Sequence, residues 1–253
     1  MLSQAEKGGV QNTIQNCVTV LQNDPILADS IRLNLLSERI DIVKPMGWQR
    51  SGPTLTDTDM MYILRRMKKY GLYSEKRVSA AIRIVANENH YHPIRDYLNE
   101  LKWDGTARIS RALHRFLGAA EDELTTEALK IFLLGAIKRV FHPGCKFEMM
   151  LCLVGGQGAG KSSFFRLLAI KDEWFSDDLR RLDDDNVFRK LQGHWIMEMS
   201  EMIATANAKS IEEIKSFLSK QKETYKIPYE THPADRLRQC VFAGTTNRQD
   251  FLP

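Results

Sequence analysis

Few cysteines and no long apolar run occur in this sequence, and each absence excludes a class of protein. The four cysteines lie far apart, at positions 17, 145, 152 and 240, and form no Cys-x-x-Cys pair. A zinc site or a disulfide framework is therefore not expected. The longest apolar segment, residues 131–140, is interrupted by Lys138 and Arg139, and no secretion signal follows Met1. We predict a cytoplasmic protein without membrane contact.

A large excess of positive or negative charge is also absent. The 253 residues carry a formal net charge of +4, which is compatible with nucleic acid as a partner but does not prove it. No internal repeat and no low-complexity tract is present. With 43% hydrophobic residues the chain can bury a substantial core, and its length suggests one or two domains.

Glycine, by contrast, is concentrated in one informative stretch. Residues 155–162 read G-G-Q-G-A-G-K-S, which fits the phosphate-binding loop pattern G-x-x-x-x-G-K-[ST]. The apolar run before it, residues 149–154, has strand length and no polar alternation, which is typical of a strand buried on both faces. Residues 163–169 carry apolar side chains at helical spacing. Strand, loop and helix is the order that the motif requires, and a chance glycine-rich turn needs neither neighbour.

The chemistry of this stretch favours a nucleoside triphosphate. Glycines let the backbone aim its N–H groups at phosphate oxygens, and the following helix N-terminus adds its dipole. Lys161 supplies a cation for the β- and γ-phosphates, and the Ser162 hydroxyl can bind Mg²⁺. We therefore predict ATP and Mg²⁺ as ligands. The predicted nucleotide-binding residues are Gly155, Gly156, Gln157, Gly158, Ala159, Gly160, Lys161, Ser162 and Ser163.

A second apolar run, residues 194–201, ends in acids. We expect a buried strand next to the loop strand, with Glu198 and Glu201 at its carboxyl end. In ATPases of this type one such acid holds Mg²⁺ and another orients the attacking water. The sequence leaves open which acid does which, and surface acids after a buried strand are the alternative. We assign Ser162 and Glu198 as metal ligands.

A third strand is expected over residues 238–246, and Asn247 follows it. A polar side chain at the carboxyl end of a strand faces the ligand crevice of an open α/β sheet. Asn247 is therefore expected to bind the γ-phosphate or the attacking water. The predicted catalytic residues are Lys161, Glu198, Glu201 and Asn247.

Two segments are rich in basic residues. Residues 220–229, a predicted strand or hairpin, carry Lys220, Lys222 and Lys226 between tyrosines. Cations interleaved with rings suit single-stranded nucleic acid, so these lysines are predicted DNA contacts, although an edge hairpin blunted by lysines is the alternative. Residues 65–77 hold six basic side chains and a single acid, which indicates a solvated helix face or a phosphate-contacting surface.

Periodicity predicts a mainly helical region before the glycine loop. Helices are expected over residues 12–21, 59–69, 74–87, 94–101, 110–117 and 126–141, and paired strands over 30–36 and 39–43. We place the domain boundary near Trp103. Residues 1–103 are then an accessory or DNA-binding region, and residues 104–253 hold the nucleotide site.

Several short motifs resemble one family when they are taken in order. They are N-x-Y-H-P-I-R-D-Y-L at 89–98, W-D-G at 103–105, H-P-G-C-K at 142–146, the glycine loop, W-F-S-D at 174–177, W-I-M-E-M-S-E at 195–201, I-K-S-F-L-S at 214–219 and T-T-N at 245–247. This order resembles the virulence-associated protein E family of prophages and pathogenicity islands. The resemblance implies an α/β fold, with a P-loop NTPase core like those of AAA+ and superfamily 3 helicases and a mostly helical N-terminal domain.

The resemblance also implies roles for single residues. It makes Gly160, Lys161 and Ser162 the nucleotide site, Glu198 and Glu201 the acidic motif and Asn247 a sensor. Family members continue after T-T-N with an Asp-containing segment and a Gly-Asn-Arg-Arg-like one, whereas this chain stops at Pro253. The nearest substitutes for an arginine that acts across subunits are Arg236 and Arg238.

The expected function is that of an ATP-dependent DNA helicase or translocase in phage-like replication. Its expected partners are single-stranded or forked DNA, further copies in a homo-oligomeric ring such as a hexamer, and a primase or replication-initiation protein. Two alternatives stay open: a nucleotide-switched DNA-binding or loading protein with little turnover, and a small-molecule kinase that uses the same loop.

Overall fold

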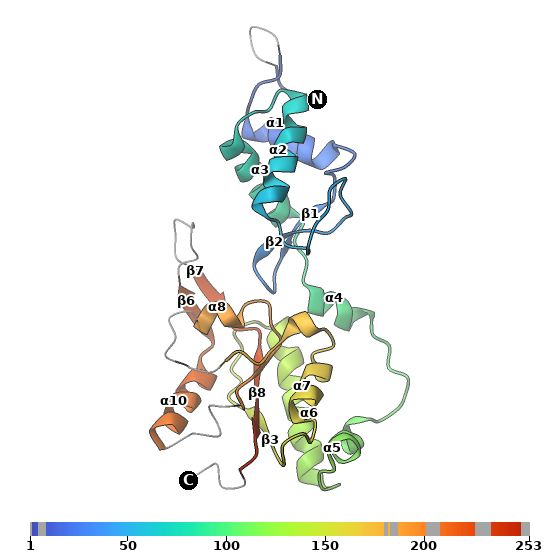
Figure 1. The fold of residues 1–253 in the computed structure, drawn as a ribbon, viewed down its shortest axis with the longest axis vertical. Coiled ribbons are helices and arrows are strands. Elements are labelled where there is room, and N and C mark those ends of the chain that lie inside the picture. Colours follow the sequence, from blue (N-terminus) through green and yellow to red (C-terminus); the bar gives the residue numbers. More distant parts are fainter. Residues whose placement is uncertain are drawn as a thin grey trace. The chain divides into compact units, whose positions relative to one another are not determined.

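The computed structural model describes residues 2–4, 9–179, 182, 187–200, 208–225 and 234–248. The backbone divides into two compact units, Met1–Asp96 and Tyr97–Pro253, here called the N-terminal and C-terminal units (Figure 1). The division falls within helix α4 (Pro93–Glu100), a few residues before Trp103, where the sequence places the boundary. Each unit has a hydrophobic cluster of its own.

The N-terminal unit packs three helices against a two-stranded hairpin. Its elements are α1 (Ile14–Asn23), β1 (Ile31–Asn34), β2 (Arg39–Ile42), α2 (Asp57–Met67), the 3-10 helix η1 (Lys68–Tyr70) and α3 (Glu75–Glu88). The predicted helices and strands are confirmed to within a few residues. Side-chain oxygens of Thr13, Thr56 and Ser74 cap α1, α2 and α3.

Helical spacing builds the core of this unit. In α3, Val78, Ala81, Ile82 and Val85 occupy positions i, i+3, i+4 and i+7, which share one helix face. The other elements supply the facing side chains, which include Cys17, Leu21, Ile31, Ile42, Ile63 and Met67. Burial of each large aliphatic side chain contributes about 1.5–3 kcal/mol, so this cluster holds the unit together.

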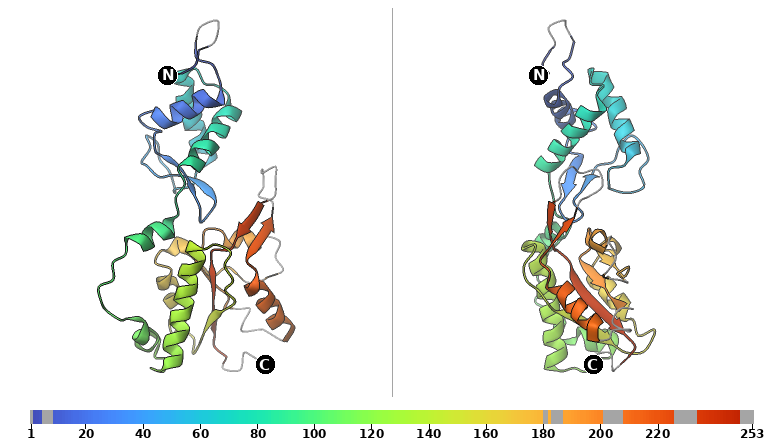
Figure 2. Two further views of the ribbon diagram at one scale, coloured as in Figure 1. Left: turned by 180° about the vertical axis from the view of Figure 1, so that it is seen from behind. Right: turned by 90° about the vertical axis from the view of Figure 1, so that its left-hand side faces the viewer.

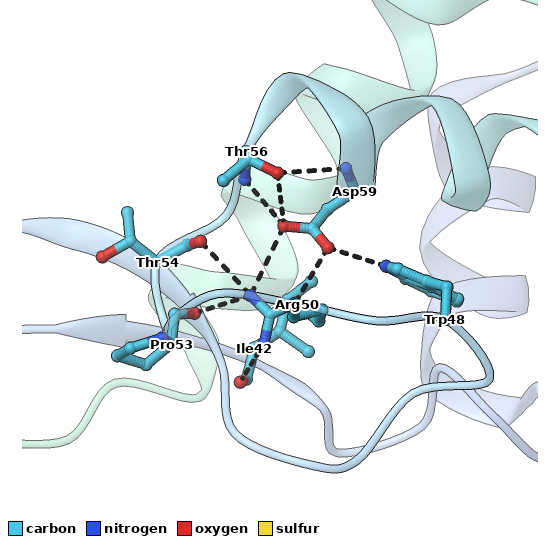
Figure 3. A network of polar contacts seen from close by, with 7 residues as sticks. All are labelled: Ile42, Trp48, Arg50, Pro53, Thr54, Thr56 and Asp59. Carbon is cyan, nitrogen blue, oxygen red and sulfur yellow. Dashed lines mark hydrogen bonds and ion pairs between the residues drawn. The ribbon is translucent and has the colours of Figure 1, made fainter.

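A buried carboxylate fixes the loop before α2 (Figure 3). Asp59 is only 2% exposed and accepts hydrogen bonds from Trp48 Nε1 and Arg50 Nε, both at 2.8 Å. Arg50 also donates to the carbonyl oxygens of Ile42 and Pro53. Burial alone would raise the pKa of Asp59, but the hydrogen bonds from Arg50, Trp48 and Thr56 outweigh it and lower the pKa to about 2.

The C-terminal unit combines helices with a parallel sheet. Its helices are α5 (Ile109–Leu117), α6 (Glu123–Phe141), α7 (Lys161–Leu168), η2 (Asp172–Trp174), α8 (Val187–Leu191) and α10 (Ala208–Ser219). Its strands are β3 (Met150–Val154), β4 (Phe175–Ser176), β5 (Ile196–Glu198), β6 (Lys222–Tyr225), β7 (Ala234–Leu237) and β8 (Val241–Thr246). No helix in the described ranges has both the length and the apolar character that crossing a bilayer requires.

Four parallel strands form the main sheet in the order β3-β8-β5-β4. Two expectations are corrected here. The acid-bearing strand β5 does not lie next to the loop strand β3, because β8 pairs with both. Strand β3 is an edge strand of the described sheet, so its residues are half-buried and Val154 is exposed instead of being covered on both faces.

Helices cover both faces of the sheet (Figures 1 and 2). On one face α6 contacts α7 through Phe132 and Phe165, whose ring centroids are 5.8 Å apart. On the other, α10 packs against β5 and β8, and Met197 belongs to this cluster. Because successive strand residues point to opposite faces, Glu198 points to the side of α7. The alternation of β5 therefore brings this carboxylate toward the glycine loop.

Candidate functional site

The glycine loop joins β3 to α7 with the geometry that its sequence predicts. Gly158 and Gly160 have φ angles of 80°, in the left-handed region that glycine adopts without strain, and α7 begins at Lys161. Gly155 does not use this freedom, since its φ is not positive. Its N–H instead donates to Thr246 O at 3.1 Å, which ties the start of the loop to the end of β8.

The Lys161 ammonium connects the loop with the neighbouring strand end. Its Nζ donates to Gly155 O at 2.7 Å, to Gly156 O at 2.8 Å and to Asn247 Oδ1 at 3.0 Å. These three bonds match the three donors of an ammonium group. Lys161 and Asn247 are far apart in the sequence, and the insertion of β8 beside β3 places them together.

A buried carboxylate lies at the start of α7. Glu198 is 1% exposed, and its Oε1 accepts hydrogen bonds from Ser162 Oγ at 2.7 Å and from Thr245 Oγ1. Its Oε2 is buried and has no hydrogen-bond partner among the described residues. A buried carboxylate oxygen without a partner is costly, so this atom points to a ligand such as a cation.

The glycine loop from Gln157 to Ser163 lines one cavity of about 430 Å³ together with Asn247. Glu198 is hydrogen-bonded to two of the lining residues, Ser162 and Thr245. Ser200, Thr245 and Thr246 also line the cavity, and none of the three was predicted as a site residue. The alternation of β8 places Thr245 on the same face as Glu198, which becomes visible only once the sheet order is known.

The donor set suits Mg²⁺ together with a phosphate chain. Among the described residues no cluster of three or more His, Cys, Asp or Glu side chains gathers. Mg²⁺ is usually bound through one or two carboxylates together with substrate phosphates, so a fuller protein cage is not needed. Ser162 Oγ and the second oxygen of Glu198 fit this mode, and the N–H groups of the loop suit phosphate oxygens.

The other predicted site residues lie elsewhere or outside the described ranges. Glu201 and Lys226 are outside them. Lys220 and Lys222 were predicted as DNA contacts, but Lys222 of β6 pairs with Asp235 of β7. Lys220 precedes the strand, and its ammonium lies 5.0 Å from the ring centroid of Phe188. The neighbouring strand β7 therefore places an acid beside Lys222, which the sequence of β6 alone does not show.

Arg238 is buried and cannot act across subunits, although the sequence offered it as a substitute for such an arginine. It is 3% exposed, pairs with the buried Glu223 and donates to Phe217 O. Its guanidinium also lies 4.6 Å from the ring centroid of Phe217. These contacts make Arg238 part of the packing between α10 and the β6–β7 hairpin.

Comparison with known proteins defines the family. The model of the virulence-associated protein E-like domain matches residues 98–253, which begin next to the division between the two units. The chain belongs to this family. No curated protein matches the chain.

Solved structures of the NrS-1 C-terminal region share the fold. The A form apo structure is 14% identical, with a TM-score of 0.55, and the match covers 91% of this chain and 56% of that one. A further apo structure of the same region is 14% identical, with a TM-score of 0.53, and the match covers 94% and 58%. This chain thus spans little more than half of those structures, and the likeness supports a mixed α/β fold with a parallel sheet.

Proposed function

We propose that the chain contains a P-loop NTPase core and acts as an ATP-dependent DNA helicase or translocase in a prophage-type replication system. The observation that carries this proposal is the contact between Ser162 of the glycine loop and the buried Glu198 of β5. A chance glycine-rich turn has no reason to place a hydroxyl and a buried carboxylate together beside a lysine. Membership of the virulence-associated protein E-like family supports the replication role.

The glycine loop, the strand ends and the two glutamates have separate roles in this proposal. The backbone of residues 155–163 cradles the phosphates, and Lys161 exchanges loop carbonyl oxygens for β- and γ-phosphate oxygens. Ser162 and Glu198 hold Mg²⁺, which neutralises charge on the phosphates. Asn247 and Glu201 orient the attacking water, and Asn247 already contacts Lys161. The buried Thr245 hydroxyl positions Glu198.

The outer surface of α6 supports assembly of several copies. Four apolar side chains of this helix are between 37% and 56% exposed: Ile131, Leu134, Ile137 and Phe141. The opposite side of the helix is also largely apolar, and it is buried. Exposed lysines also lie on the outer side of the helix, so the face mixes apolar and charged side chains, and grouped exposed apolar side chains are typical of an interaction surface. We therefore propose a homo-oligomeric ring, for example a hexamer, that uses this face. A primase or replication-initiation protein is the proposed further partner.

Stimulation by DNA tests the proposal. Purified chain is assayed for release of inorganic phosphate from ATP, with and without single-stranded DNA, and with Lys161→Ala as the inactive reference. If the chain is a translocase, single-stranded DNA should increase the rate of phosphate release several-fold. Slow turnover with ATP-dependent DNA affinity would favour a nucleotide-switched loader instead. Transfer of phosphate to a small acceptor, with no effect of DNA, would favour a kinase.

A further inference from the structure

The basic segment at the junction of α2 and α3 is sorted by the fold into an inward and an outward set. Arg66 and Tyr70 turn inward to Asp24, which is 2% exposed and accepts from Arg66 Nε at 2.5 Å and Tyr70 Oη at 2.6 Å. Met67 and Leu72 are fully buried in the core of the N-terminal unit. This anchoring determines which side chains remain at the surface.

The outward set consists of four cations and one exposed ring. Arg65, Lys68, Lys69 and Lys76 are exposed, and none has an ion-pair partner in the part of the chain that the structure describes. Tyr73 lies between them in sequence and is 63% exposed. These five residues are here called the basic face. Glu75 is the single acid between residues 65 and 77, so the local charge stays strongly positive.

The surface beneath one end of the basic face is held firmly. The Arg65 guanidinium lies 4.9 Å from the ring centroid of Tyr62, and the Trp48 ring stacks on Tyr62 at 4.9 Å with an interplanar angle of 5°. Trp48 is in turn held by the buried Asp59 (Figure 3). The helices on either side are capped by Thr56 and Ser74. The cations therefore start from a rigid base, which lowers the entropy lost on binding.

We infer that the basic face binds a single strand of DNA, its cations contacting phosphates and Tyr73 stacking on a base. Unpaired lysines gain free energy by releasing counterions from phosphates. An exposed aromatic ring adds to binding only where bases are unstacked, which favours a single strand over a duplex. The choice of DNA rests on the proposed function, but binding at this face requires no nucleotide.

Salt titration tests the cations. Binding of a fluorescent oligothymidine to the full chain is measured by anisotropy at several salt concentrations without nucleotide. The variant Lys68→Ala/Lys69→Ala/Lys76→Ala should reduce the log–log slope by about 2, since each phosphate contact to a single strand contributes about 0.7. The matched control is Lys44→Ala/Lys146→Ala/Lys215→Ala, which removes the same charge from lysines that pair with Asp29, Glu148 and Glu212. An unchanged slope in the first variant, or an equal loss in the control, overturns the inference.

A second variant tests the ring. Tyr73→Ala should weaken binding of the normal strand about tenfold, and Tyr73→Phe, which keeps a ring, should bind it as wild type does. An abasic strand of equal charge offers no base to stack, so wild type and Tyr73→Ala should bind it equally well. Equal loss on normal and abasic strands, or tighter binding of duplex than of single strand, overturns the inference. All titrations are repeated with Lys161→Ala. DNA binding that this variant retains is independent of the proposed ATP site, so the two proposals can fail separately. Circular dichroism checks that each variant is folded.

Discussion

At the scale of single residues, the two oxygens of Glu198 differ in a way that predicts a mutant phenotype. One oxygen accepts from Ser162 and Thr245, and the other is buried without a partner among the described residues. Glu198→Gln keeps the shape and both hydrogen bonds but removes the charge. We expect ATP binding to persist and hydrolysis to fall by on the order of 10², since loss of one charge-stabilising group has effects of this size.

The control for this prediction is Glu212→Gln, which changes an exposed acid of α10 that pairs with Lys215. Phosphate release is measured together with binding of a fluorescent ATP analogue. Normal hydrolysis by Glu198→Gln would contradict the assigned role, whereas loss of binding and hydrolysis together would indicate a structural one.

Two buried aspartates predict how stability depends on acid. Hydrogen bonds from Arg66 and Tyr70 outweigh the effect of burial and lower the pKa of Asp24 to about 2, and Asp59 is lowered to about 2 as well. Because an unfolded aspartate has a pKa near ~3.9, the stabilisation is complete above about pH 4 and is lost as the pH falls to about 2. Each carboxylate should contribute about 2 kcal/mol to the free energy of unfolding.

Hydrogen exchange of the N-terminal unit at pH 6 and at pH 3 measures this loss residue by residue. The Asp24→Asn/Asp59→Asn variant should be less stable at pH 6 and should change little on acidification. Equal acid sensitivity of wild type and variant would show that other carboxylates dominate.

At the scale of elements, α6 is tied to the sheet by a buried arginine. Arg139 is fully buried and donates to Cys240 O at 2.8 Å and to Phe147 O at 2.7 Å, next to the starts of β8 and β3. Burial lowers its pKa. Nearby, a Cβ on Gly135 would lie 2.2 Å from the Phe147 ring, which explains a glycine inside this helix.

We expect Arg139→Lys to lower the free energy of unfolding of the C-terminal unit by about 3 kcal/mol, because one ammonium does not reproduce two diverging hydrogen bonds. Chemical denaturation of the full chain measures the change. Its neighbour Lys138 is exposed, so Lys138→Ala should change stability by less than about 0.5 kcal/mol. Equal effects of the two substitutions would refute the buried role of Arg139.

Local elements were predictable because their signals are local. The helical spacing of apolar side chains predicts the helices, and Gly158 and Gly160 predict the loop. The observed helices lie within a few residues of their predicted bounds. The order of the strands depends on contacts between distant segments, so the insertion of β8 beside β3 was missed. For the same reason Arg139 was read as an interruption of an apolar run, and Lys222 as an unpaired cation.

At the scale of the whole molecule, the apolar outer face of α6 is the feature that predicts self-association. Leu134 is 56% exposed at the middle of this face. We expect Leu134→Lys to shift the particle mass toward the monomer when DNA and a non-hydrolysable ATP analogue are present. Met61→Lys, which changes an exposed apolar residue of the N-terminal unit, is the matched control. A mass that Leu134→Lys leaves unchanged would remove α6 from the interface.

The family was within reach of the sequence, because its short motifs follow one another in a fixed order along the chain. The family match begins at residue 98, next to the division between the two units. The basic face was visible only as a charged segment. Its separation from Arg66 and Tyr70 depends on Asp24, which lies more than forty residues earlier and whose role no periodic pattern reveals.

The central claim is that the cavity around Lys161 binds and hydrolyses ATP. It is tested by the Mg²⁺-dependent release of phosphate from ATP by wild type, by Lys161→Ala and by a control variant, Lys44→Ala, which changes an exposed lysine of the N-terminal unit. We predict that wild type and control hydrolyse ATP at similar rates and that Lys161→Ala is at least about 100-fold slower. The Lys161 cation stabilises the charge that develops on the transferred phosphoryl group. Equal hydrolysis by Lys161→Ala and wild type would contradict the account.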